Sequence, residues 1–424
     1  MNMDYNSELS KINSIVSSQN NWRKKECINL IASENITSPA MDAAYNSDFS
    51  HRYAEGDPWK RYYNGTKYID EIEEYTLSLA SDLFGAKHVN LQPVSGTVAN
   101  LAAFSMFTRP GDMVLTNGTA AGGHISHNSW GAAGILGTNV INFPTTEEGF
   151  HIDIDATRKI IENKWVNVRN HLTTVMFGCS FFLFPQPVKE LADDAHNAGL
   201  HIIYDAAHVF GLIAGKQFQD PLREGVDIIS SSTHKTLFGP QGGILLSNME
   251  DKEWKRCKGT VFPGVVSNHH LHRIPALAVA LLEHKVFGQE YALQILKNAK
   301  AFAQALSEEG FRVAAEKYGF TKSHQVALDV SKIGGGSAVA NKLEENNIIV
   351  NKNIMPWEKI SFKTLANPSG IRIGVQEMTR WGMKEGDFKE LARIFKSILV
   401  DGNDMKLRVR EFRSGFQEIN YTFS

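Results

Sequence analysis

The chain has 424 residues, of which 42% are hydrophobic and 21% are charged, and its formal net charge is -2. A chain of this length buries a large core and is too long for one ordinary domain, so we expect two domains. The near-neutral charge argues against a nucleic-acid-binding surface, and no apolar run reaches the roughly 20 residues that a membrane span needs.

The first residues lack the basic and apolar blocks of a signal peptide. Residues 1–48 are expected to form an N-terminal arm with one helical stretch. Residues 49–275 are expected to form a large domain, because short apolar runs alternate there with helical patterns, which is typical of βαβ units and a mainly parallel sheet. The candidate strands are 86–94, 113–116, 140–143, 173–179, 200–205, 227–230 and 243–246.

Ile274 and Pro275 open a long helical pattern, which we interpret as the bridge into a smaller C-terminal α/β domain of residues 276–424. Within it, the basic run 406–413 is interpreted as a solvated helix face. The three cysteines show no paired spacing, so the sequence predicts neither a disulfide framework nor a zinc site. We therefore expect reduced thiols and a cytoplasmic protein that binds neither nucleic acid nor membrane.

A candidate phosphate site precedes the helical pattern 101–104. Ser95, Gly96 and Thr97 would place hydroxyl groups and backbone N–H donors at the positive end of a helix dipole, which suits a phosphate. Ordinary N-capping by Ser or Thr explains such a pattern more often than not. The motif is weak by itself.

Asp205 ends an apolar run and is followed by small residues. This places a carboxylate at the carboxyl end of a predicted parallel strand, where open α/β sheets bind ligands. Pyridoxal phosphate (PLP) needs such an acid, because a carboxylate that faces the pyridine nitrogen keeps it protonated and lets the ring withdraw electrons. The alternative is an acid that caps the next helix.

Lys235 follows the mostly apolar run 226–229, stands among hydroxyl residues next to His234, and precedes a Gly/Pro turn. A lysine amine condenses with an aldehyde only when it is deprotonated, so a catalytic lysine is held where burial or positive charge lowers its pKa. An isolated lysine is ordinarily a solvated surface group. The order of phosphate motif, acid and lysine favours a Schiff-base role here.

That order matches the large domain of aspartate-aminotransferase-type (fold type I) PLP enzymes. Together with 30–35, 51–56 and 61–63, the lysine motif resembles the serine hydroxymethyltransferase family from about Lys25 onward. The resemblance implies an α/β fold with a mainly parallel large-domain sheet and a smaller C-terminal α/β domain. It also implies transfer of the serine hydroxymethyl group to a reduced pterin, giving glycine and the methylene-pterin.

The resemblance assigns further residues to PLP. His124 would stack on the ring, His208 would lie beneath it, and Ser180 would lie near the phenolic oxygen. Each is also compatible with a simple loop position. The full expected cofactor set is Tyr53, Ser95, Gly96, Thr97, His124, Ser180, Asp205, His208, His234 and Lys235.

Arg372 lies inside an apolar run, where arginines are rare unless they are paired, and a guanidinium group suits a carboxylate. The resemblance gives Arg372 and Ser33 the carboxylate of the amino-acid substrate, and it places Tyr63 in the substrate pocket. The alternative for Arg372 is a structural ion pair.

Glu55 is the expected acid–base residue. In the family its loop reaches the active site of the neighbouring subunit, which implies a homodimer with shared active sites, whereas the alternative is a surface charge. The expected catalytic set is Lys235, Glu55, His124, Asp205 and Tyr63. The expected pterin contacts are Glu55, Tyr62, Ile125 and Asn353.

Clusters of histidines, at 124 and 127 and at 269–272, could also suggest a metal. No carboxylate or cysteine stands beside them at ligand spacing, so we expect none. Three departures from the widespread bacterial and eukaryotic pattern, at Gln241, 262–270 and 375–377, resemble the archaeal branch. They leave the pterin open between tetrahydrofolate and tetrahydromethanopterin.

Two other functions compete with the transferase. A PLP-dependent threonine or β-hydroxy-amino-acid aldolase would share Lys235 and Asp205 without needing a pterin site, whereas Glu55, Tyr62 and Asn353 favour the transferase. A non-catalytic binding protein on the same fold would not need the lysine. The choice between a dimer and a tetramer also stays open.

Overall fold

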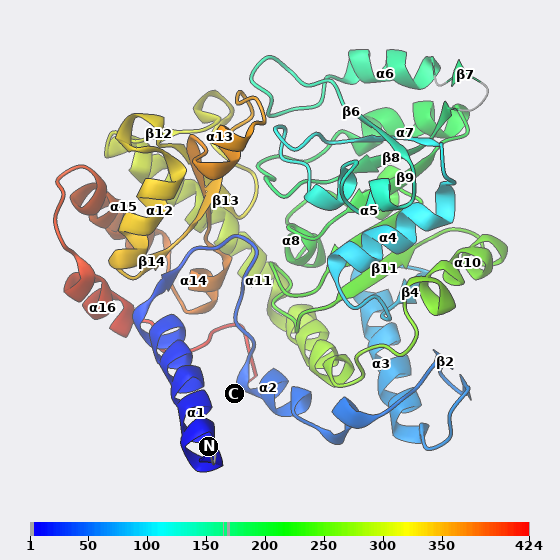
Figure 1. Ribbon diagram of the computed structural model, residues 1–424, viewed down its shortest axis with the longest axis horizontal. Coiled ribbons are helices and arrows are strands. Elements are labelled where there is room, and N and C mark those ends of the chain that lie inside the picture. The colour runs from blue at the N-terminus through cyan, green and yellow to red at the C-terminus, as the bar shows by residue number, and fades with distance from the viewer. Residues whose placement is uncertain (1–3, 164, 168–169, 424) are drawn as a thin grey trace.

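The computed structural model describes residues 4–163, 165–167 and 170–423. Its largest sheet contains β4 (His88–Asn90), β5 (Met113–Thr116), β6 (Asn139–Asn142), β7 (Trp165–Asn167), β8 (Asn170–Phe177), β9 (His201–Asp205), β10 (Ile228–Ser232) and β11 (Gly243–Ser247). The order is β4-β11-β10-β9-β8-β5-β6, with β7 paired to β8 (Figure 1). All pairs from β10 to β6 are parallel, whereas β11 is antiparallel to both of its neighbours.

Every candidate strand of the sequence overlaps a strand of this sheet, so the mainly parallel sheet is confirmed. The predicted strand 86–94 was too long, because β4 ends at Asn90. Pro93 lies two residues beyond Leu91 and has no N–H for a strand ladder, so the chain turns there into the next helix.

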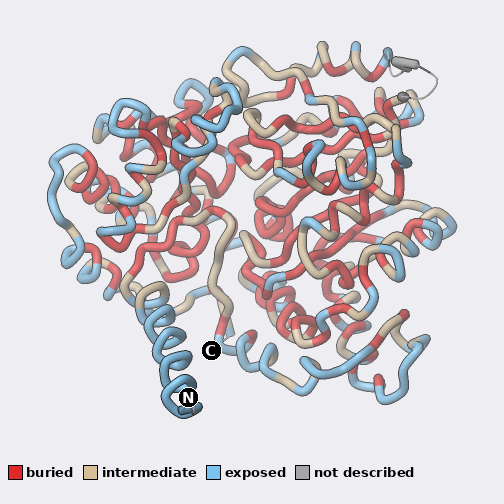
Figure 2. Tube along the Cα trace, viewed as in Figure 1, coloured by how far each residue is buried: buried red, intermediate tan, exposed pale blue. Residues whose placement is uncertain are grey.

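Helices cover both faces of the sheet, and the strand sequences require this. On one face lie α3 (Lys67–Phe84), α7 (Val188–Asn197), α8 (Phe210–Ala214) and α11 (Arg273–Glu308), and on the other α4 (Gly96–Phe107) and α10 (Asp251–Lys258). On β9, Ile202 and Tyr204 join the first apolar cluster and Ile203 joins the second. Because successive strand residues point to opposite faces, an unbroken apolar run needs cover on both sides (Figure 2).

A second sheet is antiparallel and has the order β12-β13-β16-β15. Its strands are β12 (Arg312–Val313), β13 (Gln325–Asp329), β15 (Asn351–Asn353) and β16 (Gly370–Gly374). Helix α12 (Gly335–Glu345) packs beside this sheet, and α15 (Glu385–Leu399) packs against α11 and α12. The remaining elements of the described residues include α5 (Ala132–Ile135), α6 (Ile154–Glu162), α9 (Pro221–Glu224), α13 (Phe362–Ala366), α14 (Gln376–Arg380), β2 (Gly56–Asp57) and β3 (Lys60–Arg61).

The 36-residue helix α11 connects the two sheets and begins at Arg273, where the sequence pattern predicted a long helix. At its start, the Arg273 guanidinium donates to the backbone carbonyls of Pro93 and Gly243, beside β4 and β11. Near its end, Phe302 packs against Phe388 and Phe395 of α15. The helix therefore holds the two sheets in a fixed relation.

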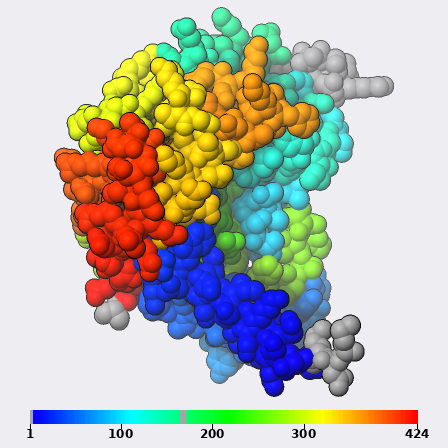
Figure 3. Space-filling view, turned by 60° about the vertical axis from the view of Figure 1, so that its left-hand side comes forward, coloured from blue at the N-terminus to red at the C-terminus, as the bar shows by residue number. Residues whose placement is uncertain are grey.

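The N-terminal arm contains two α-helices and not the single predicted stretch: α1 (Tyr5–Asn21) and α2 (Pro39–Tyr45). Ser38 starts α2 by accepting a hydrogen bond from the Met41 N–H at 3.2 Å, with Pro39 in the first turn. Between the helices, β1 (Ile28–Asn29) pairs in parallel with β14 (Ile348–Ile349). The arm is thus joined to the C-terminal part of the chain (Figure 3).

The basic run 406–413 forms most of α16 (Lys406–Ser414). Its first residues are exposed as predicted, but the prediction was wrong for Arg413, which is fully buried. The Arg413 guanidinium donates to the Cys27 carbonyl at 2.9 Å and lies 4.4 Å from the ring centroid of Trp381. This arginine is a packing residue and not a solvated charge.

The three cysteines are buried free thiols. Among the described residues, none of the helices combines the length and the apolar character that crossing a membrane requires.

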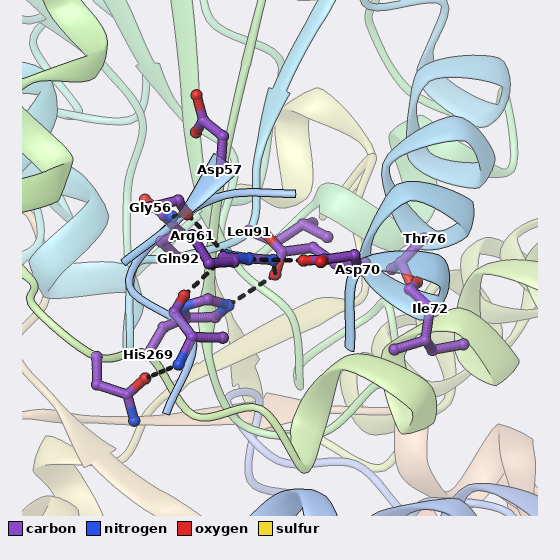
Figure 4. Close-up of polar contacts among 12 residues, drawn as sticks. Gly56, Asp57, Arg61, Asp70, Ile72, Thr76, Leu91, Gln92 and His269 are labelled. Atoms are coloured by element: carbon purple, nitrogen blue, oxygen red, sulfur yellow. Dashed lines mark hydrogen bonds and ion pairs between the residues drawn. The ribbon is translucent and has the colours of Figure 1, made fainter. Parts of the chain in front are cut away.

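A buried ion network anchors the loop around β2 and β3 to α3 (Figure 4). Arg61 donates to Asp70 and to Glu73, both at 2.7 Å, and to the Ala54 carbonyl at 2.8 Å. The His269 ring nitrogen lies 3.0 Å from Glu73. Burial alone would raise the pKa of Glu73, but the hydrogen bonds and charges of His269 and Arg61 outweigh it and hold that pKa below its usual value.

The Arg61→Met variant tests this network. It leaves Asp70 and Glu73 buried beside one fewer cation, so we expect the free energy of unfolding in urea to fall by about 3–5 kcal/mol. The matched control is Arg52→Met, because the pair of Arg52 with Asp48 is exposed and should leave the urea midpoint unchanged. Equal effects of the two substitutions would contradict the anchoring role.

Candidate active site

The carboxyl ends of parallel strands meet at one edge of the large sheet. Asp205 is the last residue of β9, Lys235 follows the end of β10, and Ser180 follows β8. Ser95 follows β4, which runs parallel to β10 because both are antiparallel to β11. A cavity of about 150 Å³ lies at this edge, lined by Ser95, Gly96, Thr97, Asn100, His124, Cys179, Ser180, Asp205, Ala207, His208, Ser232, His234 and Lys235.

Asp205 is a buried carboxylate with three hydrogen-bond donors. Its Oδ2 accepts from Asn100 Nδ2 at 2.8 Å and lies 3.0 Å from His127 Nε2, and its Oδ1 accepts from the Ala207 N–H at 3.0 Å. Burial alone would raise the pKa of Asp205, but the hydrogen bonds that the carboxylate makes with His127 and Asn100 hold it well below its usual range. The carboxylate is therefore an anion at neutral pH.

Asn100 and His127 are site residues that the sequence reasoning did not assign. Ser230 Oγ donates to the side-chain oxygen Oδ1 of Asn100 at 2.6 Å. This bond fixes the side-chain amide so that its nitrogen faces Asp205. The available signal was an amide residue among Ala99, Ala102 and Ala103, on the buried face of α4.

A carboxylate does lie beside His124 and His127, contrary to the prediction. The ligand atoms of His124, His127 and Asp205 lie within 4.8 Å of one another. The fold brings Asp205 to histidines that are about eighty positions away in the sequence. The absence of a metal stays a prediction.

Lys235 lies inside the cavity, within reach of the charges of Asp205 and Arg372. Lys235 Nζ donates to Ser232 Oγ at 2.8 Å. Burial lowers the pKa of Lys235 to about 8, with the charge of Asp205 opposing that shift and the charge of Arg372 adding to it. A substantial share of this amine is therefore neutral at mildly alkaline pH.

The histidines of the cavity are neutral. His124 Nδ1 accepts from the Ser126 N–H at 3.2 Å, and burial lowers the pKa of His124 to about 4. His208 Nδ1 lies 3.0 Å from Gln325 Nε2, and burial holds the pKa of His208 well below its usual value. Both rings can lie against an apolar face without adding a charge to the site.

Arg372 on β16 is 8% exposed and donates to the Ser180 carbonyl at 2.5 Å and to Asn351 Oδ1 at 3.3 Å. Burial lowers the pKa of Arg372 to about 10. Among the described residues no carboxylate forms an ion pair with it, so the alternative of a structural ion pair is not observed there. A buried guanidinium without an acid is a ready site for a carboxylate ligand.

The donor set fits PLP. The Lys235 amine is available to an aldehyde, and Asp205 is an anion that can hold a proton on a pyridine nitrogen. The first turn of α4, capped by Ser95, leaves N–H groups without partners inside the helix, which suits a phosphate. His234 Nδ1 is a buried nitrogen without a hydrogen-bond partner among the described residues, so it can also serve a ligand.

Four predicted residues lie away from this cavity. Tyr53, Tyr62 and Tyr63 are 54%, 79% and 43% exposed, and Glu55 is half-buried in the same loop. The rings of Tyr53 and Tyr63 are 5.4 Å apart. Within one chain the structure does not bring this loop to Lys235.

The other predicted contacts, Ser33, Ile125 and Asn353, are not among the residues that line this cavity. Ser33 lines an adjoining cavity of about 360 Å³ that shares His234 with the first. Ile125 follows His124 and is 58% exposed. Asn353 lies on β15, and its amide donates to the Ile354 carbonyl at 2.6 Å.

Comparisons with known proteins agree with this geometry. A family model described as serine hydroxymethyltransferase matches residues 6–395. Serine hydroxymethyltransferase of Metallosphaera sedula is 49% identical over 425 residues, which cover 100% of this chain and 96% of the relative. That of Sulfolobus acidocaldarius is 49% identical over 420 residues, which cover 98% and 95%. These archaeal relatives bear out the predicted resemblance to the archaeal branch.

A solved structure is also similar along the whole chain. L-threonine transaldolase from Pseudomonas fluorescens, in its internal aldimine state, superposes with a TM-score of 0.88 at 27% identity, covering 98% of this chain and 94% of that one. The fold type I prediction is confirmed.

The lowered pKa of Lys235 predicts the pH at which its amine reacts with aldehydes. We expect reductive labelling of the Lys235 peptide, followed by mass spectrometry, to be half-maximal near pH 8. Exposed lysines in the same sample are the internal control and should need higher pH. Because the charge of Asp205 raises the pKa of Lys235, Asp205→Asn should move the midpoint lower still. Labelling of Lys235 in step with the exposed lysines would contradict the assignment.

Proposed function

The chain belongs to the serine hydroxymethyltransferase family, and we propose that its lysine cavity transfers the hydroxymethyl group of serine to a reduced pterin, giving glycine and the methylene-pterin. The enzyme is PLP-dependent, as this family is. One observation carries the proposal: the cavity holds both a buried lysine and a buried anion, and an arginine with no acid partner among the described residues donates to Ser180 in its wall.

The charge of each side chain determines its proposed role in the reaction. When bound, PLP supplies an aldehyde for amines and a ring that draws electrons from the substrate carbon. Asp205 stays ionised and holds a proton at the ring nitrogen. Arg372 and Ser33 hold the substrate carboxylate, and the resulting orientation selects the bond that breaks. His124 is neutral and excludes water from one side of the site.

We propose that the second half of each active site comes from a second copy of the chain. The loop of Glu55 is anchored by Arg61 but lies outside its own cavity, with Tyr53, Tyr62 and Tyr63 exposed. A homodimer would cover these rings and deliver Glu55, which would carry the proton of the serine hydroxyl group.

The carrier would contact Tyr62 and Glu55 of that loop together with Ile125 and Asn353. A folate-type carrier is consistent with the family, and the alternatives are tetrahydrofolate and tetrahydromethanopterin. For location we propose the cytoplasm, where the three free buried thiols would stay reduced.

Transfer of a labelled carbon tests the proposed reaction. Serine carrying ¹³C at its hydroxymethyl carbon should pass the label to the methylene group of a pterin, with glycine formed in equal amount, as followed by NMR. Running the reaction with each pterin identifies the carrier. Release of labelled formaldehyde at the same rate with and without either pterin, together with rapid threonine cleavage, would favour the aldolase.

Mixing two inactive variants tests the shared site. Lys235→Ala and Glu55→Gln should each abolish pterin-dependent serine cleavage alone. In a hybrid dimer, one site carries both substitutions and the other carries neither. After random exchange of subunits, about one quarter of wild-type activity should return. No recovery, with exchange verified by mass spectrometry, would show that Glu55 does not act across subunits.

A further inference from the structure

Tyr291 of α11 joins three segments that carry proposed site residues. Its side chain is fully buried. Its hydroxyl donates to the Gln376 backbone carbonyl at 2.9 Å and accepts from Asn35 Nδ2 at 2.9 Å. The same amide nitrogen donates to the Lys235 carbonyl at 2.8 Å. The Asn35 amide therefore links the Tyr291 hydroxyl directly to the backbone of the Schiff-base lysine.

The directions of these hydrogen bonds are fixed by chemistry. The Ile36 N–H donates to Asn35 Oδ1 at 2.9 Å, which identifies the oxygen end of the amide. Both hydrogens of Asn35 Nδ2 are then used, one by Lys235 and one by Tyr291. The tyrosine must give its own hydrogen to Gln376. Removing the hydroxyl takes one hydrogen-bond partner from the half-buried Asn35 amide and one from the buried Gln376 backbone carbonyl.

Gln376 extends the network to the proposed substrate serine. Its side-chain nitrogen donates to the carbonyls of Ile31 and Glu34, at 2.8 and 2.7 Å, which lie on either side of Ser33. Gly374 lies two residues beyond Arg372 on the same strand, and its N–H donates to the Leu30 carbonyl at 2.8 Å. The Ser33 loop and the strand of Arg372 thus form one unit.

We propose that Tyr291, through Asn35 and Gln376, is a positioning residue that fixes Ser33 and Arg372 relative to Lys235 and thereby sets the affinity for the substrate carboxylate. This inference rests on the proposed roles of those three residues. A merely structural tyrosine would change stability and would not distinguish an amine that has a carboxylate from one that lacks it.

The experiment compares glycine with methylamine on PLP-loaded Tyr291→Phe protein. Both amines can react with the bound aldehyde, but only glycine carries a carboxylate. We expect the dissociation constant for glycine, from the visible absorption change, to rise about 3- to 10-fold, and that for methylamine to stay within the error of the wild type. Gln376→Met, which removes two donors at similar volume, should show the same selective loss.

The matched control is Tyr204→Phe, which removes another fully buried tyrosine hydroxyl, hydrogen-bonded to Gln219 at 2.9 Å outside the network. It should leave both dissociation constants unchanged.

Equal changes for the two amines, or no change for glycine, in either variant would overturn the inference while the proposed function stands. Should Tyr291→Phe fail to fold, the same comparison on Gln376→Met decides. A wild-type protein that binds PLP and responds to neither amine would overturn the proposed function itself.

Discussion

The buried charge of Asp205 is the constraint on which the site depends. An isolated carboxylate at this depth would take up a proton, because transfer of a charge out of water is strongly unfavourable. Asn100, His127 and the Ala207 N–H prevent this by giving the carboxylate three hydrogen bonds. Asn100 lies on α4, the helix whose first turn is the proposed phosphate site. The hydrogen bond that keeps the acid ionised therefore also fixes the distance between the two ends of the proposed cofactor site.

The rest of the cavity is arranged around that anion. Burial lowers the pKa of Lys235, and the charge of Asp205 limits that decrease. The pKa of the amine is therefore about 8, close enough to neutral pH for the amine to gain and lose a proton. Arg372 has no acid partner among the described residues and retains its charge for a ligand. Because the histidines stay neutral, they do not compete with Arg372 for the anions that enter. A single chain supplies this half of the site, and the exposed loop of Glu55 is suited to supply the other half to a neighbour.

The sequence predicted the features that depend on local pattern. Apolar runs located the strands of the large sheet, and Asp205 and Lys235 were found because strand ends and turns have recognisable compositions. Contacts between distant segments were not predictable in the same way. Asn100 meets Asp205, and Tyr291 meets Asn35 and Gln376, only after the sheet and α11 have assembled. Arg413 looked like a surface charge because its neighbours are charged, and only the fold shows Cys27 and Trp381 beside it.

The central claim is that Asp205 remains ionised and keeps the cofactor ring protonated. Protein loaded with PLP that carries ¹⁵N in its ring tests this claim directly, because the chemical shift of that nitrogen differs between the protonated and the neutral ring. Since the pKa of Asp205 lies well below its usual range, the account predicts a protonated ring nitrogen from about pH 6 to about pH 9. A neutral ring nitrogen at pH 7 in the wild-type protein would contradict it.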